Sequence, residues 1–445
     1  MQTLTPDQEV VFQRFLSGKS LFITGPAGCG KSFLIQHIKE HCERRSVPLG
    51  VTALTGTAAC IIGGQTLHGW GGLGLAKDSA DAIIKIICMR PVNHKRWRET
   101  SVLIIDEISM MSAELFNKIC LIAQKIRCKP GFFGGMQVVF CGDFAQLEPI
   151  GSDKYCFEST LWREHLTDNT FYLPRIIRQS DPVFQKVLMN LRLGKIDEET
   201  KRILNTRLIT DESEADIIVN GLGEETKIKA TVLFPKKKDV ERINKDELHK
   251  LINAGAANKN FKAEDTVVHK KSRKSVDINK VHKDALDKGL LCPEILTLAI
   301  GAQVMLIKNK SLEDGLVNGS RGVVISFDAT GCPVVVFDDG QQLSIAQEPF
   351  EIESGANCII RKQIPLILAW AITVHKCQGA TLTNVITDLS EVFGYAQVYV
   401  TLSRVRSLEG LFIVSLNYKK ILCNPKVRKY YEDLEKRLTV PTVPE

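Results

Sequence analysis

Apolar runs and polar stretches alternate regularly in the first third of the chain. Residues 21–23, 102–105 and 138–141 are apolar without interruption. Such runs are typical of strands that are buried on both faces of a parallel sheet. The segment after the first run, residues 31–44, has apolar residues at helical spacing. Because polar residues follow each predicted strand, the pattern predicts an α/β fold with a doubly wound parallel sheet.

The organisation changes beyond residue 165. A helical pattern and an apolar strand at 231–234 follow, and an α/β pattern returns from residue 364. Between residues 296 and 353, short β-type runs are separated by turn signals, which predicts a small β-barrel inserted into a second lobe. The predicted units are a first lobe (1–165), a second lobe (166–254 and 363–445) and a β-rich insert (255–362).

The first predicted strand leads into a glycine-rich segment that matches the phosphate-binding pattern G-x-x-x-x-G-K-[ST]. Glycines let backbone N–H groups turn toward a phosphate, and the helix that follows presents the positive end of its dipole. Lys31 is expected to reach the β- and γ-phosphates, and Ser32 to ligate Mg²⁺. The sequence therefore predicts a nucleoside triphosphate site. Its residues are Gly25, Pro26, Ala27, Gly28, Cys29, Gly30, Lys31, Ser32 and Phe33.

Acidic and amide side chains follow the next two predicted strands. Asp106 and Glu107 come directly after the strand at 102–105, and Gln146 lies in the loop after the strand at 138–141. We expect Asp106 to hold Mg²⁺ through water and Glu107 to act as the general base on the attacking water. Gln146 would sense the γ-phosphate.

Gln8 is compatible with two roles. It is the third residue of a helix for which Thr5 is the predicted N-cap, so the two can form a capping box. A glutamine shortly before a phosphate-binding loop can also present its amide to the edge of adenine. The spacing supports both roles equally.

Three further stretches are candidates for contacts with a nucleic-acid strand. Small and hydroxylated residues at 52–59 permit close backbone approach, although an ordinary strand-turn-helix connection would have the same composition. Residues 66–74 place a histidine and a tryptophan among four glycines, which suits a mobile, base-contacting loop. Residues 373–381 combine hydrogen-bond donors with a flexible glycine. Residues 398–402 predict an apolar strand, and Arg404, at its end, could act as an arginine finger if the second lobe closes on the first.

Composition permits a nucleic-acid partner without requiring one. The chain has 58 Lys and Arg against 51 Asp and Glu, a net charge of +7, which is compatible with a basic groove. Its 13 cysteines form no C-x-x-C pair, as expected of free thiols in a reducing, intracellular compartment that the sequence does not specify further. No apolar run approaches membrane-spanning length, so we expect no membrane partner.

Taken together, these blocks resemble the petite-integration-frequency (Pif) family of superfamily-one DNA helicases, which are relatives of RecD. The order and spacing of the motifs match over most of the chain, including the additional blocks Arg178-Gln179 and residues 316–319. The resemblance implies two RecA-like lobes, a small wedge segment at about 66–100 and an SH3-like barrel insert. The chain departs from the family pattern at Ala145, Glu148 and Cys377, which leaves the role of the loop at 142–149 open.

The resemblance also implies roles for individual residues. Gln8 would read adenine, Lys31, Ser32, Asp106 and Glu107 would handle Mg-ATP, and Gln146 would couple the γ-phosphate to DNA. Arg178 and Arg404 would be arginine fingers. The residues implied to contact single-stranded DNA are Thr55, Gly56, His68, Thr373, His375 and Lys376.

The leading hypothesis is an ATP-hydrolysing DNA helicase that acts on single-stranded, forked or structured DNA. Roles in replication, repair, recombination and telomere maintenance are associations of the family. The 5′-to-3′ polarity of the helicase comes from the resemblance and not from the residues. We expect a monomer in solution that can assemble on DNA. The alternative is a nucleotide-gated single-strand clamp or recruiting subunit that does not separate strands. RNA unwinding is a third possibility, because a motor that tracks the backbone need not read the 2′-hydroxyl.

Overall fold

The computed structural model describes most of the chain. The described residues are 3–74, 76–149, 151–210, 217–221, 224–234, 237–269, 272, 274–308, 310, 316, 318–354, 357–373, 381–390, 392 and 394–439. Within them, every helix is too short or too polar to traverse a lipid bilayer.

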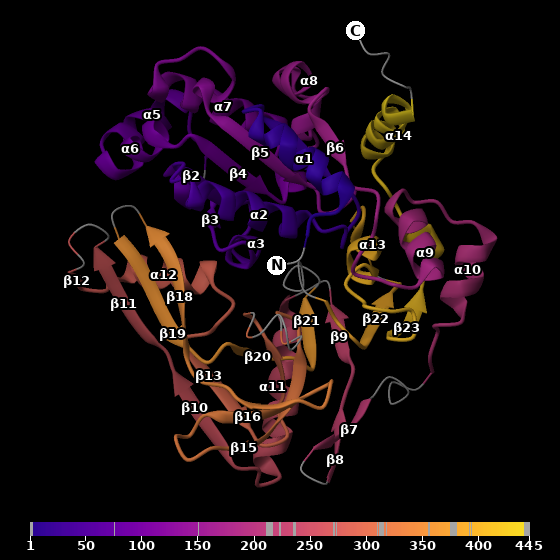
Figure 1. Cartoon of the computed structure of the whole chain (residues 1–445). Coiled ribbons are helices and arrows are strands. Elements are labelled where there is room, and N and C mark those ends of the chain that lie inside the picture. Colours follow the sequence, from indigo (N-terminus) through magenta and orange to yellow (C-terminus); the bar gives the residue numbers. More distant parts are fainter. Residues whose placement is uncertain are drawn as a thin grey trace.

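The first lobe is built on a six-stranded sheet in which every pair of neighbouring strands is parallel, with the order β3-β2-β4-β5-β1-β6 (Figure 1). This confirms the predicted α/β fold with a parallel sheet. The strands are β1 (Leu21–Thr24), β2 (Leu49–Ala53), β3 (Gln65–Thr66), β4 (Val102–Asp106), β5 (Gln137–Gly142) and β6 (Thr170–Tyr172). The helices are α1 (Pro6–Leu16), α2 (Lys31–Arg44), α3 (Gly56–Ile61), α4 (Leu67–Gly71), α5 (Ala80–Cys88), α6 (Pro91–Glu99), α7 (Ala113–Arg127) and α8 (Thr160–Leu166).

Both faces of this sheet are covered, which explains why its central strands are apolar without interruption. In β4, Leu103 and Ile105 belong to one hydrophobic cluster, while Val102 and Ile104 belong to the cluster on the other side. All five residues of β4 are buried. A strand between two helical layers has no solvent face, so alternation between apolar and polar residues is absent.

The second lobe has a smaller parallel sheet with the order β21-β9-β22-β23. Its strands are β9 (Thr231–Phe234), β21 (Ala371–Thr373), β22 (Val385–Leu389) and β23 (Leu411–Leu416). Strands β7 (Ile217–Gly221) and β8 (Glu224–Ile228) form a separate antiparallel pair. The helices are α9 (Pro182–Arg192), α10 (Glu198–Asn205), α11 (Lys237–Asn253) and α13 (Gln397–Leu402). Short 3₁₀ turns elsewhere in the chain span Ile108–Met110, Phe132–Gly135, Cys156–Glu158 and Tyr418–Lys420.

The insert is rich in β-strands, but its described strands form three open sheets, so the predicted closed barrel is not found. The sheet orders are β10-β13, β12-β11-β19-β18 and β17-β16-β15-β14-β20. The elements are β10 (Asn258–Lys262), β11 (Glu264–His269), β12 (Ser275–Val276), α12 (Lys280–Gly289), β13 (Ile295–Ala299), β14 (Gln303–Leu306), β15 (Arg321–Phe327), β16 (Pro333–Phe337), β17 (Gln342–Ser344), β18 (Glu348–Ser354), β19 (Asn357–Gln363) and β20 (Leu366–Leu368).

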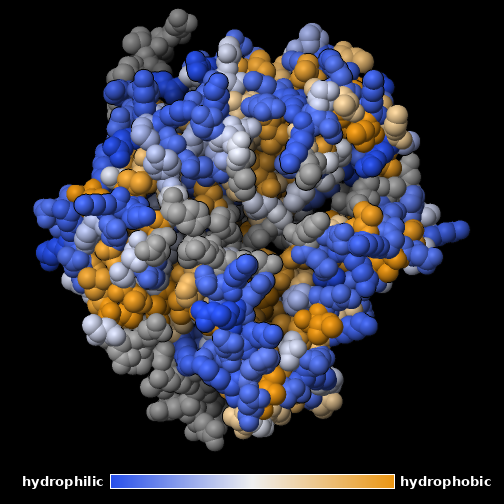
Figure 2. Space-filling view, turned by 180° about the vertical axis from the view of Figure 1, so that it is seen from behind, coloured by the Kyte–Doolittle hydropathy of each residue, from blue (hydrophilic) through white to orange (hydrophobic). Residues whose placement is uncertain are grey.

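The last helix, α14 (Pro425–Thr439), returns to the first lobe. Sequence position alone assigns it to the second lobe, yet Val427, Tyr431 and Leu434 lie in the hydrophobic cluster of the first. Figure 1 shows it beside α8 and β6. The first lobe also extends past residue 165, because β6 pairs with β1. Seen from behind, the molecule is mostly hydrophilic and is hollowed near its centre, where the lobes and the insert meet (Figure 2).

Candidate active site

The phosphate-binding loop joins the fully buried strand β1 to helix α2. Gly28 and Gly30 adopt left-handed backbone conformations, with φ of 79° and 87°. A Cβ on Gly28 would lie 2.6 Å from Cβ of Arg178, and one on Gly30 would lie 2.6 Å from Nε2 of Gln8. The left-handed conformation therefore favours glycine at both positions, and at Gly28 the fixed Cβ of Arg178 also leaves no room for a side chain.

Lys31 is the first residue of α2, and its ammonium lies against the loop that precedes it. Nζ donates to the carbonyl oxygens of Gly25 (2.8 Å) and Pro26 (2.9 Å). Burial by itself lowers the pKa of Lys31, but Cys29 and the carboxyl groups of Asp143 and Glu107 outweigh it, so the pKa is raised. The cation is thus held at the N-terminus of a 14-residue helix, where positive charge and helix dipole both favour an anion.

Asp106 and Glu107 stand at the carboxyl end of β4. The backbone N–H of Glu107 donates to Oδ1 of Asp106 at 2.9 Å. Glu107 has φ of 56°, a left-handed conformation that is strained for glutamate and is often found at functional sites. Burial, followed by the charge of Asp106, raises the pKa of Glu107 to about 7. Its Oε2 is buried without a hydrogen-bond partner among the described residues, as expected of a group that awaits a ligand or water.

A cavity of about 850 Å³ brings the five predicted catalytic residues together. The segment before Arg404, predicted to be a strand, is the short helix α13, whose residues are all buried. Arg404 lies in the turn after α13, and its Nη2 donates to Oε1 of Gln146 in the first lobe at 3.1 Å. Arg178 lies in the connection between the lobes and donates through Nη1 to the carbonyl of Ser403 at 2.9 Å. The predicted residues that line this cavity are Gln8, Ala27, Gly28, Gly30, Lys31, Ser32, Phe33, Glu107, Gln146, Arg178 and Arg404. Gly25, Pro26 and Cys29 are buried within the loop, and Asp106 is buried at the end of β4.

The oxygen-rich character of this site fits Mg²⁺. Among the described residues, no group of three or more His, Cys, Asp or Glu side chains forms a complete metal site. Mg²⁺ commonly takes one or two protein oxygens and completes its shell with water and substrate phosphates. The Ser32 hydroxyl and the Asp106 carboxylate would provide such oxygens.

Gln8 forms the predicted capping box. Oε1 accepts from the backbone N–H of Thr5 at 2.9 Å, and Oγ1 of Thr5 accepts from the N–H of Gln8. Nε2 of Gln8 also donates to the carbonyl of Gly30 at 3.2 Å. The helix cap therefore holds the amide against the phosphate-binding loop, and adenine recognition stays a prediction.

The residues implied to contact DNA are spread over the first lobe and the edge of the second. Thr55 caps α3, since its Oγ1 accepts from the N–H of Ala58 at 3.2 Å. Gly56 faces the insert, and a Cβ there would lie 2.6 Å from the carbonyl oxygen of Gly289. His68 lies on α4, and burial lowers its pKa. Thr373 ends β21, whereas His375 and Lys376 lie outside the described residues.

The glycine-rich loop at 66–74 differs from the prediction. Residues 67–71 form helix α4, and Trp70 is 2% exposed. Its ring packs edge-on against Trp97, with the centroids 4.8 Å apart. Trp70 is therefore a core residue and is not placed to stack on a base. The composition of residues 66–74 did not indicate that Trp70 would pack against Trp97, which lies outside this segment.

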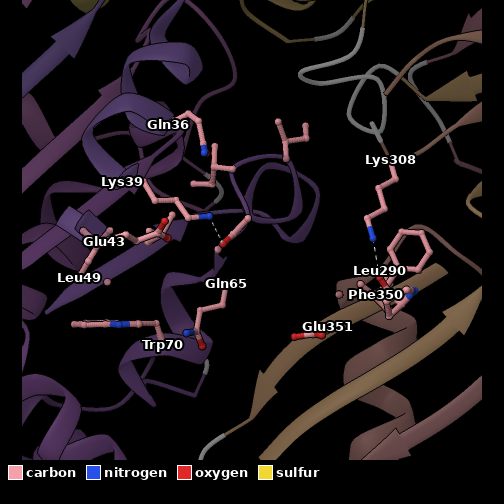
Figure 3. A pocket seen from close by; sticks show the side chains of 18 of the residues that line it. Gln36, Lys39, Glu43, Leu49, Gln65, Trp70, Leu290, Lys308, Phe350 and Glu351 are labelled. Atoms are coloured by element: carbon pink, nitrogen blue, oxygen red, sulfur yellow. Dashed lines mark hydrogen bonds between the residues drawn. The ribbon is translucent and has the colours of Figure 1, made fainter. Parts of the chain in front are cut away.

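A larger cavity of about 910 Å³ lies between the outer edge of the first sheet and the insert. Figure 3 shows Lys39 and Trp70 on the side of the first lobe and Lys308, Phe350 and Glu351 on the side of the insert. None of the predicted nucleotide-binding residues lines it. The smaller cavity at the phosphate-binding loop is therefore the candidate active site, because the chemically reactive groups converge there.

Sequence reasoning missed a buried ion pair beside this site. Arg192 of α9 donates through Nε and Nη2 to the two carboxylate oxygens of Asp143, at 2.9 and 2.8 Å. Both side chains are almost fully buried. The guanidinium also lies 4.0 Å from the ring centroid of Tyr431. The sequence could have indicated Asp143, because it follows an apolar strand just as Asp106 does, but it did not indicate Arg192.

Asp143→Asn is expected to lower stability by about 3 to 5 kcal/mol, because it leaves the buried charge of Arg192 without its counter-ion. For a lobe of this size, the midpoint of thermal unfolding would fall by on the order of 10 °C. The matched control is Asp81→Asn, whose partner Lys125 is exposed, and which is expected to cost less than about 1 kcal/mol. Equal shifts for the two variants, measured by calorimetry, would contradict this account.

Comparison with known proteins identifies the family. The family described as PIF1-like helicase matches residues 3–202, and the one described as DNA helicase Pif1, 2B domain, matches residues 282–327. The ATP-dependent DNA helicase PIF1 of Danio rerio is 38% identical over 98% of this chain and 64% of its own length, so the chain spans somewhat less than two thirds of that relative. The ATP-dependent DNA helicase Pif1 of Bdellovibrio bacteriovorus is 34% identical over 97% of this chain and 92% of its own.

The fold leads to the same result. The crystal structure of Pif1 helicase from Candida albicans has 35% sequence identity and a TM-score of 0.74, and the match covers 98% of this chain and all of that one. Sequence identity and fold therefore agree along nearly the whole chain. On this evidence, the chain belongs to the family of PIF1-like helicases.

Proposed function

We propose that this chain is an ATP-driven motor that moves 5′ to 3′ along single-stranded DNA and unwinds forked or structured duplexes. The observation that carries the proposal is the division of one cavity between two lobes. Lys31 and Glu107 come from the first lobe, and Arg404 comes from the second. A hydrolytic site assembled in this way is complete only when the lobes are together, so hydrolysis and lobe movement are coupled.

The proposed roles follow from the positions of the side chains. Lys31 and the N-terminus of α2 would hold the β- and γ-phosphates, and Ser32 and Asp106 would hold Mg²⁺, which would neutralise charge on those phosphates. Glu107 would take a proton from the attacking water. Arg404 and Arg178 would stabilise the negative charge that develops on the transferred phosphoryl group.

Gln146 is the proposed link between chemistry and movement. Its amide oxygen accepts a hydrogen bond from Arg404 of the other lobe, and its side chain lines the cavity. Loss of the γ-phosphate would therefore change the surroundings of both residues at once. The loop that carries Gln146 follows β5 and contains Asp143, so its backbone is anchored in the buried core.

DNA as the substrate is supported by the relatives, since the zebrafish and Bdellovibrio proteins are both named ATP-dependent DNA helicases. In this chain, the proposed contacts to the DNA strand are made by Thr55, Gly56, His68, Thr373, His375 and Lys376. Roles in replication, repair or recombination are proposed on the same support. The protein would act as a monomer in solution, in a reducing intracellular compartment. The side chains of eleven of its cysteines are described, and each of these is a free thiol.

The test is steady-state ATP hydrolysis with and without oligo-dT, combined with unwinding of duplexes that carry a 5′ or a 3′ single-stranded tail. We expect strong stimulation by the oligonucleotide and unwinding from the 5′ tail alone. A rate of ATP hydrolysis that does not change when DNA is added, with both duplexes left paired, would contradict the proposal and favour a single-strand clamp. Unwinding from the 3′ tail would contradict the polarity while leaving the motor intact.

A further inference from the structure

A hydroxyl group of the second lobe is hydrogen-bonded to the phosphate-binding loop. Tyr399 lies on α13 and is 1% exposed. Its hydroxyl accepts from the backbone N–H of Ala27 at 2.8 Å and lies 3.5 Å from Oδ2 of Asp143, to which it can donate. Ala27 is in the middle of the loop that precedes Lys31. The two lobes are therefore joined at the loop by a contact that needs no nucleotide.

The same short helix positions Arg404. The N–H of Ser403 donates to the carbonyl of Tyr399 at 2.9 Å, so the turn that leads to Arg404 is built on Tyr399 itself. Nε of Arg404 donates back to the carbonyl of Val400 at 3.2 Å, which fixes the guanidinium to the helix. Any displacement of α13 relative to the phosphate-binding loop therefore displaces Arg404 relative to the cavity.

Burial makes the contact from Tyr399 rigid. Burial and the nearby charge of Asp143 raise the pKa of Tyr399, so the hydroxyl keeps its proton and can accept and donate at the same time. Asp143 is itself fixed by its ion pair with Arg192. Without the hydroxyl, the buried N–H of Ala27 would lose its acceptor, which is a costly state for a backbone group.

We propose that Tyr399 is a positioning residue that sets the distance between the phosphate-binding loop and the turn after α13 that carries Arg404. The inference rests on the ATP-hydrolysing function proposed above. Tyr399 acts through Ala27 on one side and through the backbone of α13 on the other, and it is not placed to touch the phosphates. It lets the second lobe respond to the conformation of the loop directly.

Tyr431 offers a matched control within the same network. Its hydroxyl donates to Oδ1 of Asp143 at 2.8 Å, accepts from the N–H of Phe144 at 2.9 Å and bonds the Thr24 hydroxyl at 2.8 Å. It is also a buried phenol on the same carboxylate, but it lies on α14, which packs on the first lobe. Tyr431→Phe therefore deletes the same chemical group without cutting a link between the lobes.

The experiment compares Tyr399→Phe with Tyr431→Phe. With saturating oligo-dT, Tyr399→Phe is expected to lower kcat for ATP about tenfold, the equivalent of about 1.4 kcal/mol, with KM changed less than twofold. Tyr431→Phe is expected to lower the unfolding temperature by a similar amount as Tyr399→Phe and to keep kcat within twofold of the original protein. Equal losses of kcat in the two variants, or none in either, would overturn the proposal.

A second readout does not depend on hydrolysis. Amide hydrogen exchange of the segment that contains Ala27 is expected to accelerate at least tenfold in Tyr399→Phe and to stay unchanged in Tyr431→Phe. If the original protein does not hydrolyse ATP, the proposed function fails, and this exchange result still decides whether the contact holds the loop. Unchanged exchange in Tyr399→Phe would overturn the inference even if the protein is an active helicase.

Discussion

Replacing Glu107 with glutamine is expected to reduce kcat for ATP hydrolysis by about 10²- to 10⁴-fold while nucleotide binding persists. The amide cannot accept the proton of the attacking water, but it has nearly the same size as the carboxylate. Removing one of two neighbouring buried carboxylates also reduces repulsion toward the phosphates, so binding should be no weaker. The measurements are single-turnover hydrolysis and titration with a fluorescent ATP analogue.

Two comparisons sharpen this result. Glu114→Gln removes an exposed carboxylate from α7 and is expected to leave kcat unchanged. Asp106→Asn is expected to raise the concentration of Mg²⁺ that is needed for half-maximal rate, which Glu107→Gln should affect less. Full turnover by Glu107→Gln would exclude this residue as the base.

The pKa of Glu107 also predicts how the rate depends on pH. Because burial raises this pKa to about 7, the carboxyl is protonated on the acid side and becomes a competent base as pH rises through that value. We therefore expect kcat/KM for ATP to increase between about pH 6 and about pH 8 and then to level, since kcat/KM follows the groups of the free enzyme. A profile of Glu107→Gln that kept the same rise would assign it to another group.

The second large effect is expected for Arg404→Ala, which should lower DNA-stimulated kcat by about 10³-fold or more. Arg404 reaches the cavity from the opposite lobe and is 3% exposed. Without it, charge that develops on the phosphoryl group has one fewer cation, and the bond to Gln146 across the lobes is lost. KM for ATP should change much less, because a finger acts mainly in the transition state.

Arg406 provides the control for this variant. It lies two residues further along the same segment and is exposed. Arg406→Ala removes an equal charge and is expected to keep kcat within about twofold. If Arg404→Ala raised KM and left kcat unchanged, Arg404 would be a ground-state binding residue and not a finger.

Local signals in the sequence were sufficient for the first lobe. Strands buried on both faces had to be continuously apolar, and the polar residues at their carboxyl ends had to meet at one edge of the sheet. This is why Lys31, Glu107 and Gln146 line one cavity. Motif spacing added Arg404, although its distance from Gln146 could be known only once the second lobe was in place.

What the sequence could not show depends on partners that are far away along the chain. The β-runs of the insert were visible, but not which edges pair, and β11 pairs with β19 over a long separation where a closed barrel was expected. Nothing in the charged pattern of α14 indicates that Tyr431 contacts Asp143, which is 288 residues away. Tyr399 was hidden in the same way, inside an apolar run that looked like core.

The return of α14 to the first lobe restricts how the two lobes can move. The backbone crosses from one lobe to the other at residues 173–181 and crosses back at 421–424. Because the lobes are joined at two points, the easiest motion of one lobe relative to the other is a rotation about the line through these points. The phosphate-binding loop lies against the first crossing, since the backbone N–H of Arg178 donates to the carbonyl of Gly28 at 3.2 Å. Small changes near this axis would therefore become large arcs at the far strands of the insert, as at the end of a lever arm.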